Sequence, residues 1–175
     1  MTSLFQRVIG APFDTLPAPI RVIHDGAPLR HCEGSSRVER GSGWLSRLCG
    51  ALTSLPAAAE ETPLRVTIRA GADHETWERN FGGRMMRSRF RVHDGLLEES
   101  LGPASFRFRL VAQADAIAWK LAGVRCLGLA LPMSWFDRFT ARESFEGGLY
   151  RFDVRVELPM TGLLVHYDGT LDVGA

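Results

Sequence analysis

Three polar residues stand where the alternating pattern of the chain calls for apolar side chains. They and their same-face neighbours are Arg79 (Trp77 and Phe81), Glu143 (Ala141 and Phe145) and Ser88 (Met86 and Phe90). Successive side chains of a β-strand point to opposite faces, so residues two positions apart share a face. A charge on a buried face must be paired or solvated, because desolvating it alone is costly. Arg79 and Glu143 are therefore the first candidates for a site.

Two interpretations of these residues stay open. In the first, Arg79 and Glu143 meet inside a cavity, with Ser88 beside them, and hold the polar end of a ligand. The aromatic residues that would line the rest of this cavity are Trp77, Trp119, Tyr150 and Tyr167. In the second, a β-bulge shifts the register and puts both charges in water. From the sequence alone we favour the bulge.

The chain contains no motif that carries a known reaction. Serine-hydrolase, zinc-protease, P-loop and dinucleotide-binding patterns are all missing, so no catalytic residue, metal ligand or cofactor is assigned. The histidines have no metal-ligand spacing, and those beside an Asp in turn-like contexts are expected to face solvent: His24, His74 and His93. Three scattered cysteines without a C-x-x-C pair indicate neither zinc nor a disulfide framework, and they are typical of a reducing cytoplasm.

Composition points to one globular domain over residues 1–175. Apolar residues make up 45% and charged residues 23% of the 175 positions, which is ordinary for a protein with a packed core. The net charge of +1 argues against general nucleic-acid binding, which needs a basic surface. No stretch reaches the roughly 18 apolar residues of a membrane span. We expect a cytoplasmic protein without a membrane span.

The elements that would position Arg79 and Glu143 are antiparallel strands. Residues 150–158 alternate strictly between apolar and charged side chains, and a turn at 159–162 leads into a return strand. From residue 63 onward similar strands are joined by short Gly-containing turns, nine or ten strands in all. Such a sheet would curl into a barrel or half-barrel to hide its apolar face. The predicted fold class is mainly β (α+β), with sheet over 61–175.

Residues 1–60 are predicted to cover this sheet with two or three short helices. Ser3 caps a helix that ends before Gly10, a second helix runs from Pro17 or Ala18 to His24, and a third spans 44–55. The third could lie at a membrane interface, but we favour a helix that packs on the sheet or plugs a barrel end. Leu29 to Arg40 is a weak strand because Gly34 interrupts it. A START-like helix-grip fold is the alternative, although it usually ends in a long helix.

Several stretches together resemble a bacterial family known as domain of unknown function 4166. The stretches that carry the resemblance are residues 16–26, 38–56, 81–90, 101–110 and 141–169. The resemblance covers nearly the whole chain but implies no reaction, because the family has none assigned. Similar domains occur alone or appended to Rossmann-type oxidoreductases. Because this chain has no dinucleotide fingerprint, the resemblance implies at most a partnership with such an enzyme.

Three functions follow, in order of preference. The first is a non-enzymatic binding module that holds a small apolar or amphipathic ligand in a barrel-like cavity. The second is an accessory domain with a fully packed core that contacts a separate oxidoreductase through an Arg-rich outer face. That face would comprise Arg87, Arg89, Arg91, Arg107, Arg109, Arg151 and Arg155. The third is an enzyme that uses Glu143 as acid or base and Arg79 as an anion clamp.

Overall fold

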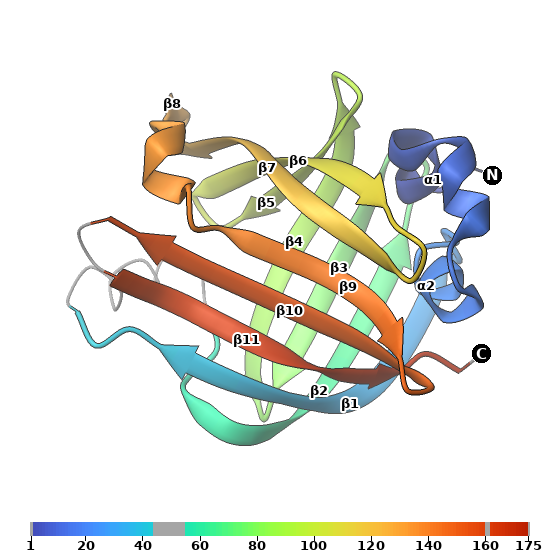
Figure 1. Cartoon of the computed structure of the whole chain (residues 1–175), viewed down its shortest axis with the longest axis horizontal. Helices are drawn as coiled ribbons and strands as arrows, with labels where there is room; N and C mark the ends of the chain where they lie inside the picture. The colour runs from blue at the N-terminus through green and yellow to red at the C-terminus, as the bar shows by residue number, and fades with distance from the viewer. Residues whose placement is uncertain (1, 44–54, 160–161, 175) are drawn as a thin grey trace.

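The computed structural model describes residues 2–43, 55–159 and 162–174, and these form a closed antiparallel β-barrel (Figure 1). The helices are α1 (Leu4–Ile9), η1 (Ala11–Thr15), α2 (Ala18–Ile23) and η2 (Met133–Phe136). The strands are β1 (Leu29–Arg40), β2 (Ala59–Ala70), β3 (His74–Phe81), β4 (Arg84–His93), β5 (Leu96–Leu101), β6 (Ala104–Ala112), β7 (Ala116–Cys126), β8 (Leu129–Ala130), β9 (Thr140–Glu146), β10 (Leu149–Leu158) and β11 (Gly162–Asp172).

Ten of these strands make the ring. Strands β1 to β7 pair in sequence order, β7 pairs with β9, and β9, β10 and β11 lead back to β1. The additional β6–β7 pairing closes the barrel, and β8 is a two-residue extension on β7. This confirms the mainly β prediction. The helix-grip alternative is wrong, because the sheet closes into a ring and none of the described helices is longer than six residues.

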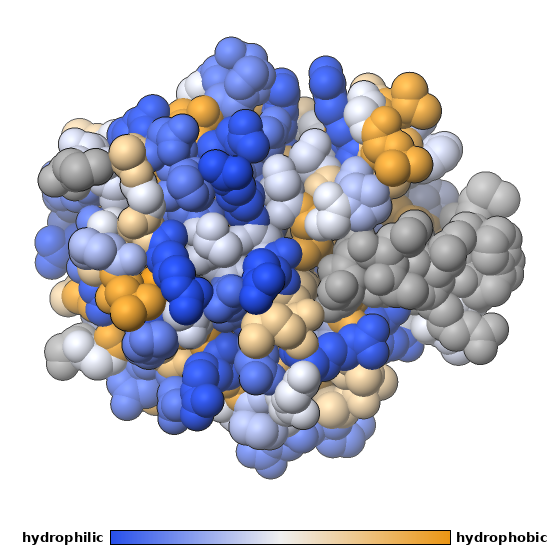
Figure 2. All heavy atoms as spheres, turned by 180° about the vertical axis from the view of Figure 1, so that it is seen from behind, coloured by the Kyte–Doolittle hydropathy of each residue, from blue (hydrophilic) through white to orange (hydrophobic). Residues whose placement is uncertain are grey.

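Alternation of side chains separates the interior from the surface. In β4, Met86, Ser88 and Phe90 are buried, whereas Arg87, Arg89 and Arg91 are exposed. Seen from behind, the outer surface is largely hydrophilic (Figure 2). Large exposed apolar residues gather next to β8 and η2, and they are Leu127, Leu129, Met133 and Trp135. The pleat therefore turns one face of each strand toward a common apolar interior.

The barrel begins before the predicted boundary at residue 61. Strand β1 pairs with β2 on one side and β11 on the other, so it belongs to the wall. Gly34 weakened the strand prediction, yet the structure requires it, because a Cβ at this position would lie 1.9 Å from the Thr170 carbonyl oxygen. Gly169 makes a similar close approach to the Ser35 carbonyl oxygen. Here glycine marks close backbone contact within a sheet.

The N-terminal helices close one end of the barrel (Figure 1). Helix α1 begins with a capping box, in which the Ser3 hydroxyl accepts from Gln6 N–H and the Gln6 side chain accepts from Ser3 N–H. Helix α1 packs against β4, β5 and β6, and α2 packs against β9. Phe5 and Ile20 are fully buried beneath them. The two predicted helices are confirmed, whereas the predicted helix at 44–55 falls almost entirely outside the described residues.

Candidate functional site: a cavity inside the barrel

The barrel encloses a cavity of about 230 Å³. Most of its lining is apolar and comes from many strands of the wall, including Val66 of β2, Phe108 of β6 and Val156 of β10, and from Phe139 just before β9. Six of the seven predicted site residues line it: Arg79, Glu143, Trp77, Trp119, Tyr150 and Tyr167. The seventh, Ser88, is buried on β4 and contacts Arg79. The alternating pattern thus brings the predicted residues together in space.

Arg79 projects inward from β3 and is held by residues of β4 and β5. Its Nη1 donates to the Ser88 hydroxyl at 2.8 Å and lies 3.5 Å from a carboxylate oxygen of Glu99 on β5. Its guanidinium carbon also lies 5.0 Å from the centre of the Trp77 ring and 5.8 Å from that of Phe90. These cation–π contacts and the ion pair compensate for the removal of the charge from water.

Glu143 projects inward from β9, on another part of the wall. Its Oε2 lies 2.8 Å from Nε2 of His24, the residue that ends α2. The Tyr150 phenol also interacts with Glu143. Burial, followed by the negative charge of Glu143, raises the pKa of Tyr150 well above its usual value. The phenol therefore stays neutral beside the carboxylate.

Glu143 therefore ties the helical cover to the cavity. His24 is completely buried, and its ring stacks on Phe5 of α1 with centroids 3.6 Å apart. Among the described residues, the second ring nitrogen of His24, Nδ1, has no hydrogen-bond partner. Glu75, also buried under the helices, accepts from the Trp77 indole at 3.1 Å, and burial raises the pKa of its carboxyl. The barrel end beneath the helices therefore contains buried polar side chains, namely His24, Glu75 and Glu143.

The β-bulge interpretation of Arg79 and Glu143 is wrong. The pairings of β3 and of β9 run without a register shift; the barrel's shifts lie in β1, near Ser36, and in the β6–β7 and β10–β11 pairings. The Glu143 residue is 8% exposed and the Arg79 side chain 13%. The two side chains share the cavity but form no direct ion pair, because Glu99 and His24 are their partners.

Sequence reasoning missed two members of the site, His24 and Glu99. His24 was expected in solvent because Asp25 and Gly26 follow it, but it shares a helical face with buried Ile20 and Ile23. Glu99 carries the signal that marked Arg79, since Leu97 and Leu101 on either side are buried. His74 and His93, by contrast, face outward and contact Asp73 and Asp94.

The seven arginines proposed as one outer face lie on opposite walls. Arg87, Arg89 and Arg91 are on β4, Arg107 and Arg109 on β6, and Arg151 and Arg155 on β10, five strands around the ring from β4. Four of them also contact nearby carboxylates. These pairs are Arg87–Glu78, Arg91–Glu98, Arg107–Glu98 and Arg155–Glu157. A single arginine face is therefore wrong, because the ring order separates its strands.

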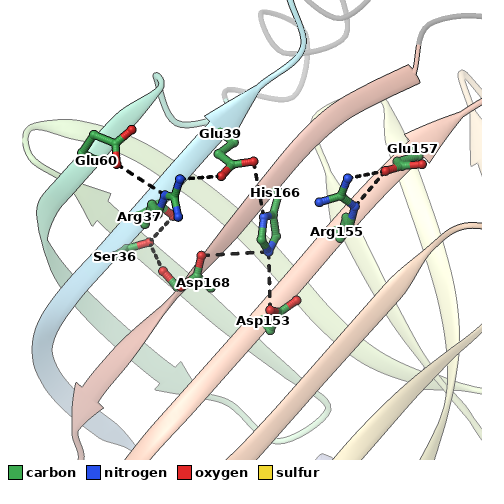
Figure 3. Close-up of polar contacts among 9 residues, drawn as sticks. All are labelled: Ser36, Arg37, Glu39, Glu60, Asp153, Arg155, Glu157, His166 and Asp168. Carbon is green, nitrogen blue, oxygen red and sulfur yellow. Dashed lines mark hydrogen bonds and ion pairs between the residues drawn. The ribbon is translucent and has the colours of Figure 1, made fainter.

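The outer wall of β1, β10 and β11 carries its own charge network (Figure 3). His166 lies 3.4 Å from Asp153, 3.8 Å from Glu39 and 3.9 Å from Asp168. Arg37 pairs with Glu39 at 2.8 Å, next to this histidine. The described residues contain no group of His, Cys, Asp or Glu side chains placed to hold a metal ion. We interpret this network as cross-strand stabilisation of the wall.

The enzyme hypothesis set one geometric condition, a shared cleft for Arg79 and Glu143. Both side chains line the same cavity. His24, the partner of Glu143, is completely buried and does not line that cavity, so it cannot touch a bound molecule directly. A reaction at Glu143 stays a prediction.

Comparison with known proteins identifies a family but no activity. The family model described as "Domain of unknown function (DUF4166)" matches residues 16–171. The comparison with curated proteins finds no match. Among solved structures, the crystal structure of Rv2717c from M. tuberculosis is similar, with a TM-score of 0.45 and 10% identity over 91% of this chain and 99% of that chain. Within the described residues, no helix has the length and apolar character needed to cross a membrane.

Proposed function

The chain belongs to the DUF4166 family, and from its cavity we propose that it is a non-enzymatic binding module for a small apolar or amphipathic ligand. The observation that carries the proposal is a cavity of about 230 Å³ with a mostly apolar lining and a few polar groups. Ligand sites in proteins have this character, apolar contacts for affinity and a few polar groups for orientation. The volume suits a ligand below the usual drug size, whose pockets begin at about 300 Å³.

The position of the polar groups supports an oriented ligand. Glu143 and Tyr150 lie near the end that the helices cover, and Arg79 and Glu99 lie about midway along the barrel. The other end of the cavity is lined by apolar residues such as Phe106, Val156, Leu158 and Phe136. An amphipathic molecule would place its polar group among these polar side chains and its apolar skeleton at the apolar end.

The accessory-domain alternative requires a fully packed core. Protein interiors pack as densely as organic crystals, and voids larger than a water molecule are few. The atoms that line an unfilled cavity of this size lack dispersion contacts on one side. A cavity of this volume is therefore inconsistent with a fully packed core. The oxidoreductase partner stays a prediction, and nothing in the arrangement of the arginines favours it.

A neutral fluorescent probe, 1-aminoanthracene, tests the proposal. We expect saturable binding with increased probe fluorescence, and loss of binding in Ala141→Trp, because Ala141 lines the cavity and the indole would fill it. Ala122→Trp is the matched control, because Ala122 is exposed on β7 and does not line the cavity. Circular dichroism would verify that both variants fold.

Two results bear against a binding function. One is probe fluorescence that does not saturate with the wild-type protein. The other is equal binding by Ala141→Trp and Ala122→Trp, which would place the probe outside the barrel. Native mass spectrometry of the purified protein adds a check that requires no choice of probe. A reproducible extra mass that disappears on denaturation supports a resident ligand.

A further inference from the structure

Each charged side chain inside the barrel already has a protein partner before any ligand enters. Arg79 lies 3.5 Å from Glu99, and these two side chains are 13% and 16% exposed. Glu143 is hydrogen-bonded to His24 and interacts with the Tyr150 phenol. Of the two arginines that line the cavity, Arg142 is 44% exposed and pairs with Asp115 at the surface. Arg79 is therefore the guanidinium inside the cavity, together with the carboxylates of Glu99 and Glu143. A ligand that brought a further negative charge would add to the carboxylate excess in a poorly solvated space.

Arg79 and Trp119 carry unused hydrogen-bond donors at the cavity. Within the described part of the chain, the hydrogen bond and the ion pair of Arg79 both run through Nη1, so Nε–H and the Nη2 amino group have no protein acceptor. The Trp119 indole N–H is buried and likewise has no partner among the described residues. Indole and guanidinium groups can only donate. Phe90 brings these two residues together, lying 5.8 Å from the Arg79 guanidinium and 6.1 Å from the Trp119 ring.

Tyr167 adds a third donor from β11. Its ring contacts Phe81 on β3, with centroids 5.9 Å apart, so it reaches across the interior toward the strand that carries Arg79. Burial raises its pKa to about 12, while the charge of Arg79 acts in the opposite direction. The phenol is therefore protonated at neutral pH. No hydrogen bond of its hydroxyl is found within residues 2–43, 55–159 and 162–174.

We infer that the ligand is an apolar molecule whose polar group is an uncharged acceptor, such as a ketone, ester or amide carbonyl, received by Arg79, Tyr167 and Trp119. This inference rests on the proposed binding function and specifies its ligand class. A carbonyl oxygen accepts from these donors without adding charge beside Glu99 and Glu143. A carboxylic acid with the same skeleton is disfavoured, because its ionised form meets those two carboxylates.

A matched pair of fluorescent probes tests this selectivity. The probes are the methyl ester of dimethylaminonaphthoic acid and the free acid, which differ in charge but share one skeleton. We expect the full-length protein to bind the ester about tenfold tighter than the acid at neutral pH, a difference typical of one unfavourable charge contact. Tyr167→Phe keeps the ring contacts but removes the hydroxyl, and it should weaken ester binding about three- to tenfold.

Two further variants separate charge from hydrogen bonding. Glu99→Gln removes one carboxylate and leaves Arg79 without its ion-pair partner, so acid binding should strengthen and the ester–acid ratio should fall. Tyr150→Phe is the control for Tyr167→Phe, because the Tyr150 hydroxyl is already committed to Glu143. It should weaken ester binding less than Tyr167→Phe does. Circular dichroism and the unfolding midpoint verify that each variant is folded.

The outcomes distinguish this inference from the binding function itself. Acid binding equal to or tighter than ester binding overturns the uncharged-acceptor inference, while the barrel remains a binding module. Equal ester binding by wild type and Tyr167→Phe overturns the role of Tyr167 as a donor. If neither probe binds the folded wild-type protein, the binding function fails and the inference fails with it.

Discussion

Replacing His24 with alanine should destabilise the barrel by several kilocalories per mole. The substitution removes the 2.8 Å hydrogen bond to Glu143 and the stack on Phe5. A hydrogen bond to a charged group contributes about 1.5–3 kcal/mol, and an aromatic stack about 0.5–1.5 kcal/mol. The expected loss is therefore about 2–4.5 kcal/mol. Total stabilities are about 5–15 kcal/mol, so the helical cover depends strongly on this one side chain.

Urea unfolding, followed by tryptophan fluorescence, measures the loss. Trp77 reports on this region, because its ring lies 5.6 Å from that of His24. The matched control is His74→Ala, since His74 also lies 2.8 Å from a carboxylate, Asp73, but on the surface. An exposed pair of this kind contributes little to the free energy of unfolding. In His24→Ala the buried carboxylate of Glu143 loses its hydrogen bond to His24. The double variant His24→Ala, Glu143→Gln should recover part of the loss, because it replaces that carboxylate with a neutral amide.

The reasoning fails if His24→Ala and His74→Ala cost the same, since burial is then irrelevant to the strength of the contact. It also fails if the effects of His24→Ala and Glu143→Gln are simply additive. Residues in direct contact normally show a coupling energy of about 0.5–3 kcal/mol. A change in the slope of the urea transition would indicate instead that the variant no longer unfolds in the same two-state manner.

Three further predictions concern packing and titration. Gly34→Ala should prevent correct pairing of β1 with β11, because its Cβ would lie 1.9 Å from a backbone oxygen, whereas Gly123→Ala, with its nearest atom at 3.9 Å, should leave the melting temperature almost unchanged. Phe5→Ala should lower the free energy of unfolding by about 3–5 kcal/mol in urea titrations, because the ring is fully buried. In an absorbance titration, no tyrosinate should form near pH 10, since the pKa of Tyr167 is raised to about 12 and that of Tyr150 well above its usual value. These phenols bind protons more tightly when folded, so stability should fall as the pH rises above 10 toward 12; tyrosinate at pH 10 in the folded protein would contradict their burial.

The sequence predicts the walls of this protein better than its interior contacts. Period-two alternation places Met86 and Phe90 inward and Arg87 and Arg89 outward, and this depends only on the pleat of one strand. The β1 strand is only weakly predicted, because a glycine has no side chain to contribute to the alternation of apolar and polar residues. Its role becomes visible only when the neighbouring strand is known, since Gly34 is needed where β11 passes close by.

Partners across the interior are a different problem. Arg79 and Glu99 lie on β3 and β5 with β4 between them, and their contact depends on two strand registers at once. His24 and Glu143 are 119 positions apart, and their contact depends on where α2 docks on the closed barrel. A local pattern can show that a charge points inward. It cannot show which partner compensates for that charge, and this is why the sequence alone favours a bulge.

The position of Glu143 decides which variants can report on binding alone. Its carboxylate holds His24 of the helical cover on one side and lines the cavity on the other. Any substitution at Glu143 therefore changes stability and the ligand environment together. Tyr167 and Glu99 line the cavity without any hydrogen bond or ion pair to the described part of the cover, so changes at these residues separate the two effects. A loss of binding in Glu143→Gln supports the site only when Tyr167→Phe, with an unchanged unfolding midpoint, weakens ester binding as well.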